Sequence, residues 1–298
     1  MDGILNVYKE QGFTSFDVVA KLRGICHTRK IGHTGTLDPA AEGVLPVCIG
    51  KATGLCEYLT EKTKAYETVM LLGRTTDTQD TTGTVLEERE VISDEEAVRQ
   101  AILSFVGTYD QIPPMYSAKK IDGKKLYELA REGKEVVRKP VAVTLSDIEI
   151  LEMDLPRVRF RVTCSKGTYI RTLCADIGEK LGCGACMEQL LRIRSGAFTL
   201  ETALRLSEIQ KLADEDRQEE VLIPLEDSFK ELPVYRIASQ GDKRLMNGNP
   251  LRLQDVEGMD PHMTGRFRIH SLEDVFIGIY QWKEDAQMFW PEKLFLRK

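Results

Sequence analysis

The sequence has no long apolar run. No stretch of its 298 residues approaches the ~18–20 consecutive apolar residues that a membrane-crossing helix needs. The first residues also lack the basic region and the apolar region that together mark a secretory signal. These absences argue against a helical membrane protein and predict a cytoplasmic location.

Residues that bind metals are scarce as well. The chain has four histidines, and they supply no second ligand pair beside the C-x-x-C spacing of Cys183 and Cys186. A tetrahedral zinc site needs about four ligands, so this pair is weak evidence for a metal. The seven cysteines stand mostly among apolar neighbours, which is typical of small buried side chains in a reducing compartment. We expect Cys183 and Cys186 to pack beside a glycine turn, with zinc or redox chemistry as the alternative.

The charge is distributed unevenly in an otherwise ordinary globular composition. The net charge of −6 argues against a nucleic-acid-binding protein, but its excess lies in 201–231, which has 4 basic and 10 acidic residues. The rest is balanced and leaves room for basic patches. The clearest patch is 119–139, with 8 basic and 4 acidic residues. This patch fits either a solvated helix face or an arm that contacts phosphates.

A second basic run alternates with apolar residues, because Arg157, Arg159 and Arg161 are separated by valine and phenylalanine. Strict alternation predicts a strand with one apolar face and one arginine face. An arginine face is unfavourable when it is uncovered, so we expect an anionic ligand or acidic side chains over it.

Strand and helix patterns are interleaved along the chain without regular βαβ units. Alternation and turn residues predict strands at 4–8, 66–73, 84–88, 143–151 and 157–164, and a buried strand or turn at 43–50. Capping residues predict helices that begin at Thr14 or Ser15, at a capping box formed by Ser93 and Glu96, and at about Thr168. The pattern favours an α+β fold with a mixed, largely antiparallel sheet flanked by helices. A strand-like tail follows the acidic stretch, so we predict two domains, 1–231 and 232–298.

The most informative segment is a glycine-rich loop at 32–39, Gly-His-Thr-Gly-Thr-Leu-Asp-Pro. Its glycines allow the backbone to approach a ligand closely. The loop lacks the spacing of a phosphate-binding P-loop, and no dinucleotide fingerprint follows it. Pro39 restrains Asp38 to an extended conformation, which fixes the direction of the carboxylate. Asp38 is therefore a candidate catalytic residue, with an ordinary Asp-Pro turn as the alternative.

Two further segments carry candidate functional side chains. Arg171 falls in the first turn of a predicted helix, where a cation opposes the helix dipole and therefore needs an anionic partner. That partner is a carboxylate or a phosphate, and a structural ion pair is the simpler alternative. Lys64 and Tyr66 share one face of a predicted strand. A tyrosine in such a place is suited to stacking on a base, although it is more often part of the core.

Together these segments resemble one family closely, the TruB-type tRNA pseudouridine synthases. The resemblance covers nearly all of residues 1–195 in order. Its motifs are the 32–39 loop with Gly-Val-Leu-Pro at 43–46, Lys-Ala-Tyr at 64–66, Ile-Pro-Pro-Met-Tyr-Ser-Ala-Lys at 112–119, Gly-Lys-Lys-Leu-Tyr at 123–127, Cys-Ser-Lys-Gly-Thr-Tyr-Ile-Arg at 164–171 and Leu-Gly-Cys-Gly-Ala at 181–185. The tail is similar, more weakly, to a PUA-like RNA-binding module. The resemblance implies a pseudouridine-synthase catalytic domain at 1–231 and a PUA-like β domain at 232–298.

The resemblance implies that uridine 55, in the T-loop of tRNA, is flipped out and isomerised to pseudouridine without a cofactor or a metal. The uracil is detached from C1′ and reattached through C5. Asp38 matches the family's nucleophile, which attacks either C1′ of the sugar or C6 of the base. Arg171 matches the arginine that pairs with this carboxylate and keeps it ionised in a desolvated pocket. Tyr66 matches the tyrosine that stacks on the target base and is a candidate for removing the C5 proton.

The same resemblance implies further substrate contacts. Tyr169 and Leu190 match pocket residues around the flipped uracil, and His33 matches a residue that inserts where flipped nucleotides leave the loop stack. We place Lys64 near the substrate backbone. The segment 112–139 matches a mobile basic arm that closes over the RNA. The expected partner is the T-stem-loop of tRNA, and we expect a monomer.

Two other functions stay open at this point. A catalytically silent RNA-binding or tRNA-folding protein would keep the basic arm but would not need Asp38, Tyr66 and Arg171 together. A hydrolase that uses Asp38 on a small molecule would not explain the arm. Salt dependence separates these functions, because binding through several phosphates weakens steeply as salt rises.

Overall fold

The computed structural model describes residues 1–296 except 118, 122, 135, 261 and 263. The chain divides into two compact units. The larger unit comprises Asn6–Val47 and Cys56–Gln218, and the smaller comprises Met1–Leu5, Cys48–Leu55 and Glu219–Lys298. The first residues belong to the smaller unit because the backbones of Ile4 and Ile223 exchange two hydrogen bonds of 2.9 Å. The domain boundary between 231 and 232 stays a prediction.

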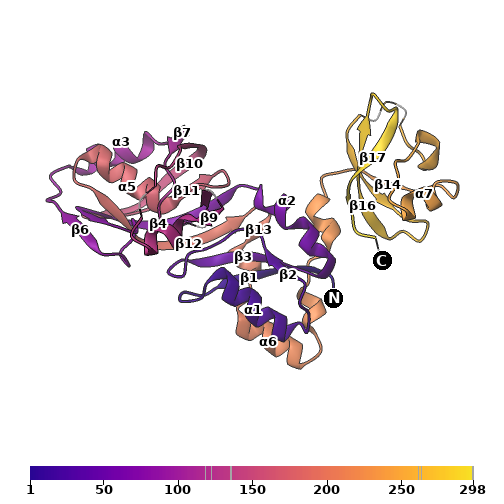
Figure 1. The fold of residues 1–298 in the computed structure, drawn as a ribbon, viewed down its shortest axis with the longest axis horizontal. Coiled ribbons are helices and arrows are strands. Elements are labelled where there is room, and N and C mark those ends of the chain that lie inside the picture. The colour runs from indigo at the N-terminus through magenta and orange to yellow at the C-terminus, as the bar shows by residue number, and fades with distance from the viewer. Residues whose placement is uncertain (118, 122, 135, 261, 263, 297–298) are drawn as a thin grey trace. The chain divides into compact units, whose positions relative to one another are not determined.

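Most of a nine-stranded sheet lies in the larger unit (Figure 1). Its main order is β1-β3-β12-β4-β11-β10-β7, and β2 and β13 pair beside β3 and β12. These strands are β1 (Gly3–Lys9), β2 (Ile31–His33), β3 (Glu42–Ile49), β4 (Lys64–Leu72), β7 (Gly107–Gln111), β10 (Val141–Asp154), β11 (Arg157–Cys164), β12 (Ala185–Ser195) and β13 (Phe198–Thr199). The pairs along β12-β4-β11-β10-β7 are antiparallel, whereas β12 and β3 run parallel. The predicted α+β fold with a mixed, largely antiparallel sheet is therefore confirmed.

Helices flank this sheet in two groups. Helix α5 contacts β4 and β12, α3 contacts α5 and β10, and α1 packs against α6 (Figure 1). The helices of the chain are α1 (Ser15–Ile25), α2 (Cys56–Thr60), α3 (Glu95–Leu103), α4 (Leu126–Arg131), α5 (Ile170–Leu181), α6 (Leu206–Asp214) and α7 (Asp242–Met246). Two small hairpins complete the unit, β5 (Arg74–Thr76) with β6 (Val85–Glu88) and β8 (Lys120–Ile121) with β9 (Lys124–Lys125). In the described residues, no helix is long and apolar enough to cross a membrane.

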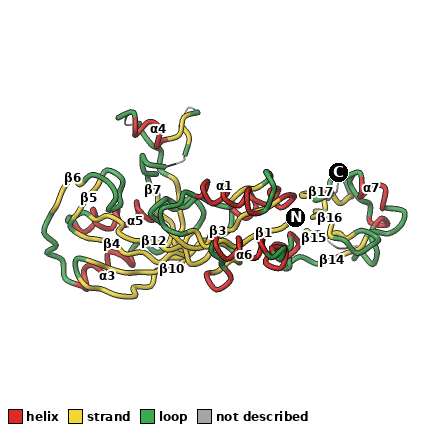
Figure 2. The backbone as a smooth tube through the Cα atoms, turned by 90° about the horizontal axis from the view of Figure 1, so that it is seen from below, coloured by secondary structure: helices red, strands yellow, loops and turns green. Residues whose placement is uncertain are grey.

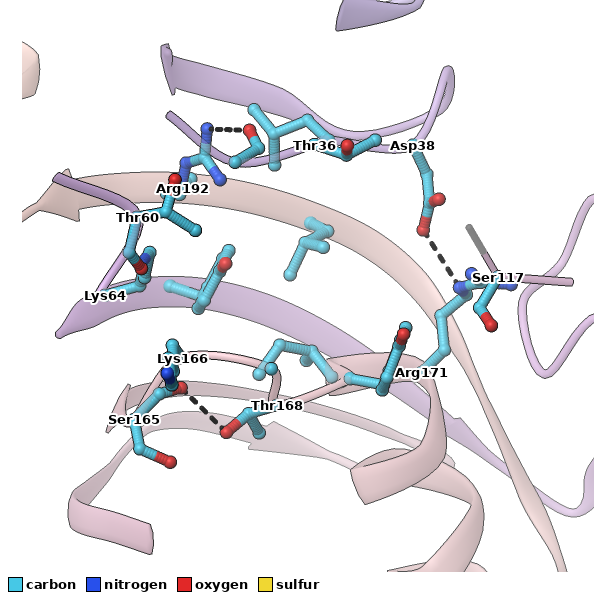
Figure 3. Close-up of a pocket in the computed structure, with 17 residues that line it drawn as sticks. Thr36, Asp38, Thr60, Lys64, Ser117, Ser165, Lys166, Thr168, Arg171 and Arg192 are labelled. Atoms are coloured by element: carbon cyan, nitrogen blue, oxygen red, sulfur yellow. Dashed lines mark hydrogen bonds and ion pairs between the residues drawn. The ribbon is translucent and has the colours of Figure 1, made fainter. Parts of the chain in front are cut away.

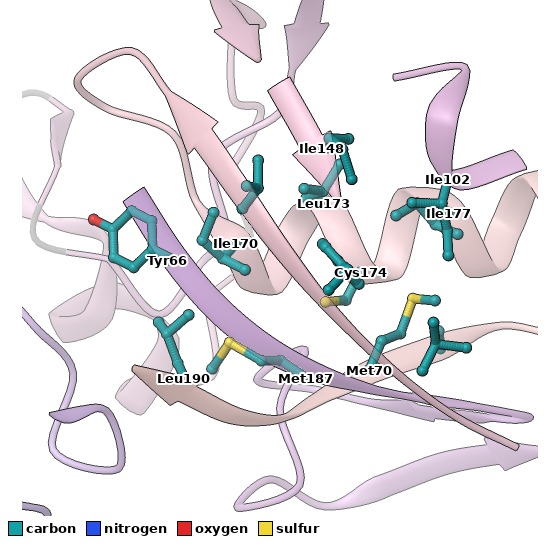
Figure 4. Close-up of a cluster of buried hydrophobic side chains, with 14 of the residues drawn as sticks. Tyr66, Met70, Ile102, Ile148, Ile170, Leu173, Cys174, Ile177, Met187 and Leu190 are labelled. Atoms are coloured by element: carbon teal, nitrogen blue, oxygen red, sulfur yellow. The ribbon is translucent and has the colours of Figure 1, made fainter. Parts of the chain in front are cut away.

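Helix α5 holds the core against the sheet (Figure 4). Its residues Leu173, Cys174 and Ile177 are fully buried, and they belong to one apolar cluster with Met70 of β4 and Met187 of β12. The helix approaches β12 closely at Gly178, where an added Cβ would lie 2.1 Å from the backbone nitrogen of Ala185. This packing fixes the start of α5, and with it Arg171, relative to the sheet.

The predicted start of α1 was confirmed, α5 begins at Ile170 close to its predicted start near Thr168, and the predicted cap of α3 was wrong. Helix α1 takes Thr14 as its N-cap, with a capping box to Asp17. Helix α3 is capped by Asp94, and not by Ser93 as the capping box predicted. The carboxylate of Asp94 accepts a hydrogen bond of 2.8 Å from the backbone nitrogen of Ala97. An aspartate at this position also interacts favourably with the helix dipole, which a serine does not.

The arginine face of β11 is covered by acidic side chains. Arg157 forms two hydrogen bonds of 2.9 Å with Glu188. Glu67 lies between Arg159 and Arg161, at 2.9 Å and 2.7 Å. The sequence allowed either an anionic ligand or acidic side chains over this face. The structure shows acidic side chains, so these arginines are paired within the protein.

The smaller unit contains a four-stranded sheet in the order β14-β15-β16-β17. Its strands are β14 (Val234–Arg236), β15 (Arg266–His270), β16 (Phe276–Lys283) and β17 (Met288–Leu294). Phe267, Tyr280 and Phe289 form its buried aromatic centre, in which the rings of Phe267 and Phe289 meet edge to face at 4.9 Å. The strand-like tail is confirmed, and its likeness to a PUA-like module stays a prediction.

Candidate active site

A cavity of about 270 Å³ opens beside the sheet of the larger unit (Figure 3). Its walls come from the 32–39 loop, the start of β4, the turn before α5, and β12. The lining residues are Gly35, Thr36, Leu37, Asp38, Thr60, Lys64, Tyr66, Ser117, Ser165, Lys166, Gly167, Thr168, Tyr169, Ile170, Arg171, Leu190 and Arg192. Six of the seven predicted site residues are in this set, and His33 is the exception.

The loop that carries Asp38 is anchored on both sides of the carboxylate. The Ser15 hydroxyl accepts a hydrogen bond of 2.9 Å from the Leu37 backbone nitrogen. The Pro39 carbonyl accepts one of 2.8 Å from the backbone nitrogen of Gly12. The loop then turns into β3 at Gly43, which has a φ of +105°, and a Cβ there would lie 2.3 Å from a backbone oxygen of β12. The loop is thereby held as a rigid support for Asp38.

Asp38 and Arg171 form an ion pair inside the cavity (Figure 3). Nε of Arg171 lies 3.0 Å from Oδ2 of Asp38. The arginine side chain is 5% exposed, whereas that of Asp38 keeps 39% of its surface accessible. The buried guanidinium thus holds the Asp38 carboxylate, and the exposed part of that carboxylate remains accessible to a ligand. This carboxylate is the anionic partner that the position of Arg171 predicted.

Three more groups orient the same guanidinium. Nη1 of Arg171 donates to the carbonyl of Thr78 at 2.9 Å, and Nη2 donates to the carbonyl of Tyr116 at 2.8 Å. Nη1 also lies 3.8 Å from a carboxylate oxygen of Asp80. Asp80 is fixed in turn by Thr82, whose hydroxyl and backbone nitrogen both donate to its Oδ1. Asp80 was not predicted, and its only sequence signal is its place in a turn rich in threonine and aspartate.

Burial and charge act in opposite directions on the nucleophile candidate. Burial raises the pKa of Asp38, and the Arg171 guanidinium opposes this rise. The nearby carboxylate of Asp80 raises the pKa of Asp38 further. Arg171 is therefore the main group that favours the ionised form of Asp38, and it partly offsets the rise in pKa that burial causes.

Tyr66 and two cations, Lys64 and Arg192, also line the cavity. Tyr66 is 8% exposed, and burial raises the pKa of its hydroxyl while the Arg192 guanidinium opposes the rise. Arg192 is 1% exposed and donates to the carbonyls of Val44 and Gly35 at 2.6 Å and 3.2 Å. It ties β12 to the loop, and it was not predicted. The sign of Arg192 in the sequence is that a charged residue occupies an inward position of an apolar strand.

Lys64 is buried beside these groups. Its ammonium donates to the carbonyl of Lys62 at 2.6 Å and to that of Thr60. Burial lowers the pKa of Lys64 to about 8. The ammonium therefore holds the turn before β4 and also lines the cavity. Its expected place near the substrate backbone stays a prediction.

A buried glutamine fixes the backbone where Tyr169 enters α5. Gln111, at the end of β7, accepts a hydrogen bond of 2.8 Å from the Tyr169 backbone nitrogen. Its amide nitrogen donates to the Tyr169 carbonyl at 3.1 Å. Tyr169 and Leu190 both line the cavity, and their contact with a flipped uracil stays a prediction. Gln111 was not predicted, because no local pattern distinguishes it from a solvated strand end.

His33 ends β2 just ahead of the loop and does not line the cavity. Its Nδ1 accepts a hydrogen bond of 3.3 Å from the backbone nitrogen of Gly35. Burial lowers the pKa of His33, which favours the neutral imidazole at neutral pH. Its role at the exit of flipped nucleotides stays a prediction.

The basic arm, 112–139, contributes to the cavity through its first residues. Tyr116 accepts a hydrogen bond from Arg171, and Ser117 lines the wall. The arm continues through β8, β9 and α4, which stand out from the sheet near β7 (Figure 2). Residues 118, 122 and 135 of the arm lie outside the described residues. Closure of the arm over RNA stays a prediction.

The part of the chain that is described holds no group of three or more histidine, cysteine, aspartate or glutamate side chains placed to bind a metal. Cys183 in the turn before β12 and Cys186 near the start of that strand are buried free thiols.

The fold and this site agree with a pseudouridylate synthase, which is the class that the comparisons with known families assign to the chain. The chain belongs to the TruB family of these enzymes: the N-terminal domain model of that family matches residues 23–170, and the model of the tRNA pseudouridylate synthase B C-terminal domain matches residues 171–230.

Named relatives and solved structures agree with this family. A tRNA pseudouridine synthase B from Lachnoclostridium phytofermentans is 50% identical, over 99% of this chain and 100% of the relative. One from Clostridium novyi is 46% identical, over 94% of this chain and 95% of the relative. A chain in a solved Cbf5-Nop10-Gar1 complex is 28% identical with a TM-score of 0.73, covering 99% of this chain and 85% of that chain.

Proposed function

We propose that this protein isomerises uridine to pseudouridine in tRNA, with uridine 55 of the T-loop as its target. The observation that carries the proposal is the Asp38–Arg171 pair at 3.0 Å, set in a cavity whose other walls hold Tyr66 and Tyr169. The ionised carboxylate acts as the nucleophile on C1′ or on C6. The bond between N1 and C1′ breaks, the bond between C5 and C1′ forms, and the C5 proton is lost while N1 gains one.

The other residues bind and orient the nucleotide. Tyr66 stacks on the uracil and assists the removal of the C5 proton, Tyr169 and Leu190 enclose the base, and His33 occupies the space that the flipped nucleotide leaves. Flipping requires about a few kcal/mol and least for a base already in a loop, which supports a T-loop target. The T-stem-loop lies under the basic arm, with Lys64 near its backbone.

The reaction requires neither a redox change nor an external nucleophile, so no cofactor enters the scheme. We further propose that the protein acts as a monomer in the cytoplasm. Light scattering across the working concentration range checks the monomer, and a dimer mass would contradict it.

Nucleoside chromatography of an unmodified tRNA transcript tests the reaction. We expect a pseudouridine peak with the wild-type protein, none with Asp38→Asn, and no peak from a transcript with cytidine at position 55. Asp147→Asn is the matched control, because Asp147 is exposed on β10 and does not line the cavity. Equal turnover by Asp38→Asn would remove Asp38 from the mechanism.

RNA binding, measured by filter retention, separates the two alternatives. Asp38→Asn is expected to retain RNA binding, and the affinity should fall steeply as salt rises. Binding without any pseudouridine from the wild-type protein would favour the catalytically silent RNA-binding function. A flat salt response with turnover of a small molecule would favour the hydrolase.

A further inference from the structure

Ser117 places an unpaired hydroxyl in the wall of the cavity. Its side chain is 5% exposed, and its Oγ has no hydrogen-bond partner among the residues that the structure describes. Figure 3 shows it beside the guanidinium of Arg171, at the Asp38 end of the cavity. A hydroxyl that is buried without a partner lowers the stability of the free protein. Such a group in a ligand cavity is explained if the ligand supplies the partner.

The backbone around Ser117 fixes the position of this hydroxyl. The Ser117 nitrogen donates to the Met115 carbonyl at 2.9 Å, and its carbonyl accepts from the Tyr127 nitrogen at 3.1 Å. The preceding carbonyl, that of Tyr116, accepts a hydrogen bond from Arg171 at 2.8 Å. The serine is therefore tied to the guanidinium that holds the nucleophile. Any nucleotide within reach of Asp38 lies in the same end of the cavity.

We propose that Ser117 is a substrate-binding residue whose hydroxyl forms a hydrogen bond with the target nucleotide. The inference rests on the proposed function and adds a residue of the basic arm to the substrate site. A hydroxyl both donates and accepts, so an oxygen of the nucleotide satisfies it. That oxygen is either the 2′-hydroxyl of the ribose or a carbonyl of the uracil.

Ser117→Ala is the test, with stability and kinetics measured on the same protein. Removing an unpaired hydroxyl leaves no polar partner behind, so the melting temperature should stay unchanged or rise. The kcat/KM for pseudouridine formation in a T-stem-loop RNA should fall about three- to tenfold, the usual effect of losing one uncharged hydrogen bond. A structural serine would lower the melting temperature and leave kcat/KM unchanged.

Two control variants isolate the hydrogen bond. Ser228 also carries a buried Oγ with no partner among the described residues, lies in the smaller unit, and does not line the cavity. Ser228→Ala should match Ser117→Ala in stability and match the wild type in kcat/KM. Ser117→Cys keeps nearly the volume of serine but is a weak donor. It should therefore be as impaired as Ser117→Ala.

A T-stem-loop with 2′-deoxyuridine at the target position identifies the oxygen. If Ser117 contacts the 2′-hydroxyl, this RNA lowers the wild-type rate but lowers the Ser117→Ala rate much less. If Ser117 contacts the uracil, the fold-loss caused by Ser117→Ala and the fold-loss caused by the 2′-deoxy substitution are independent and multiply. Either pattern supports the proposal, provided that Ser117→Ala is impaired on the unmodified RNA.

The result that overturns the proposal is a Ser117→Ala protein with wild-type kcat/KM, or a Ser117→Cys protein with fully restored kcat/KM, which would assign the effect to volume. The failure of the proposed function looks different, because the wild-type protein itself would then form no pseudouridine.

Discussion

Replacing Arg171 by lysine keeps the positive charge but removes the shape that the cavity requires. The guanidinium contacts three groups in different directions: the Asp38 carboxylate at 3.0 Å and the carbonyls of Thr78 and Tyr116 at 2.9 Å and 2.8 Å. An ammonium is a single point on a flexible stem and does not reproduce a planar fork. In Arg171→Lys, the ammonium can therefore contact either the Asp38 carboxylate or the two carbonyls, but not all three groups.

The magnitude follows from these contacts. Hydrogen bonds that involve a charged group contribute about 1.5–3 kcal/mol each, so the loss of one or two of them lowers the free energy of unfolding by about 2–4 kcal/mol. The loss of orientation at Asp38 raises the reaction barrier by about 3 kcal/mol, which is about 100-fold in rate.

A single-turnover assay with excess enzyme measures the chemical step, because tritium at C5 of the target uridine is released to water when the new bond forms. Urea unfolding measures the stability. Arg157→Lys is the matched control, since Arg157 pairs with Glu188 while its side chain is 53% exposed, and it should change the free energy of unfolding by less than about 0.5 kcal/mol. Turnover by Arg171→Lys within threefold of the wild type would refute the positioning argument.

Three further predictions concern stability and are checked by urea unfolding. Burial raises the pKa of Asp176 from 3.8 to about 6, so ionising this group costs folding free energy at neutral pH and nothing below pH 3.8. Asp176→Asn should therefore stabilise the protein by about 2 kcal/mol at pH 7.5, with the gain disappearing toward pH 4; a gain that does not depend on pH would contradict this origin. The pKa of Glu67 is lowered by the two arginines of β11, so its stabilisation is present above pH 4.5 and is lost as the pH falls through the lowered value. Glu67→Gln should destabilise the protein by about 1 kcal/mol at pH 7 and by less at pH 3, and equal losses at both pH values would argue against the ion pairs. Gly178→Ala places a Cβ 2.1 Å from the backbone of β12 and should cost about 2–3 kcal/mol, whereas Gly24→Ala, with nothing within 4 Å in helix α1, should stabilise by about 0.5–1 kcal/mol. Equal effects of the two glycine variants would show that the contact at Gly178 relaxes freely.

Local sequence patterns were sufficient for much of the fold. The strand at 4–8, the strand at 157–164 and the helix that ends at Gly182 were predicted from alternation, spacing and capping residues, since these signals act over a few neighbouring residues. The candidate nucleophile was also accessible, because Asp38 stands in a glycine-rich loop before a proline. The N-cap of α3 shows the limit of such patterns, since Ser93 and Asp94 are both good caps and the backbone geometry decides between them.

The sequence by itself determined which residue types were available: a restrained carboxylate, a cation at a helix start, a tyrosine at a strand start and a basic arm. Only the tertiary structure decided their partners. Asp80 and Gln111 reach the site from segments roughly 60–90 positions away from α5, and Arg192 ties β12 to a loop 157 positions distant. The tertiary structure also decided how far each charge is buried, because the sequence predicted an anionic partner for the β11 arginines and for Arg171 alike. The β11 arginines are paired at the surface with Glu67 and Glu188, whereas Arg171 is enclosed against Asp38, where it opposes the rise in the pKa of that carboxyl that burial causes.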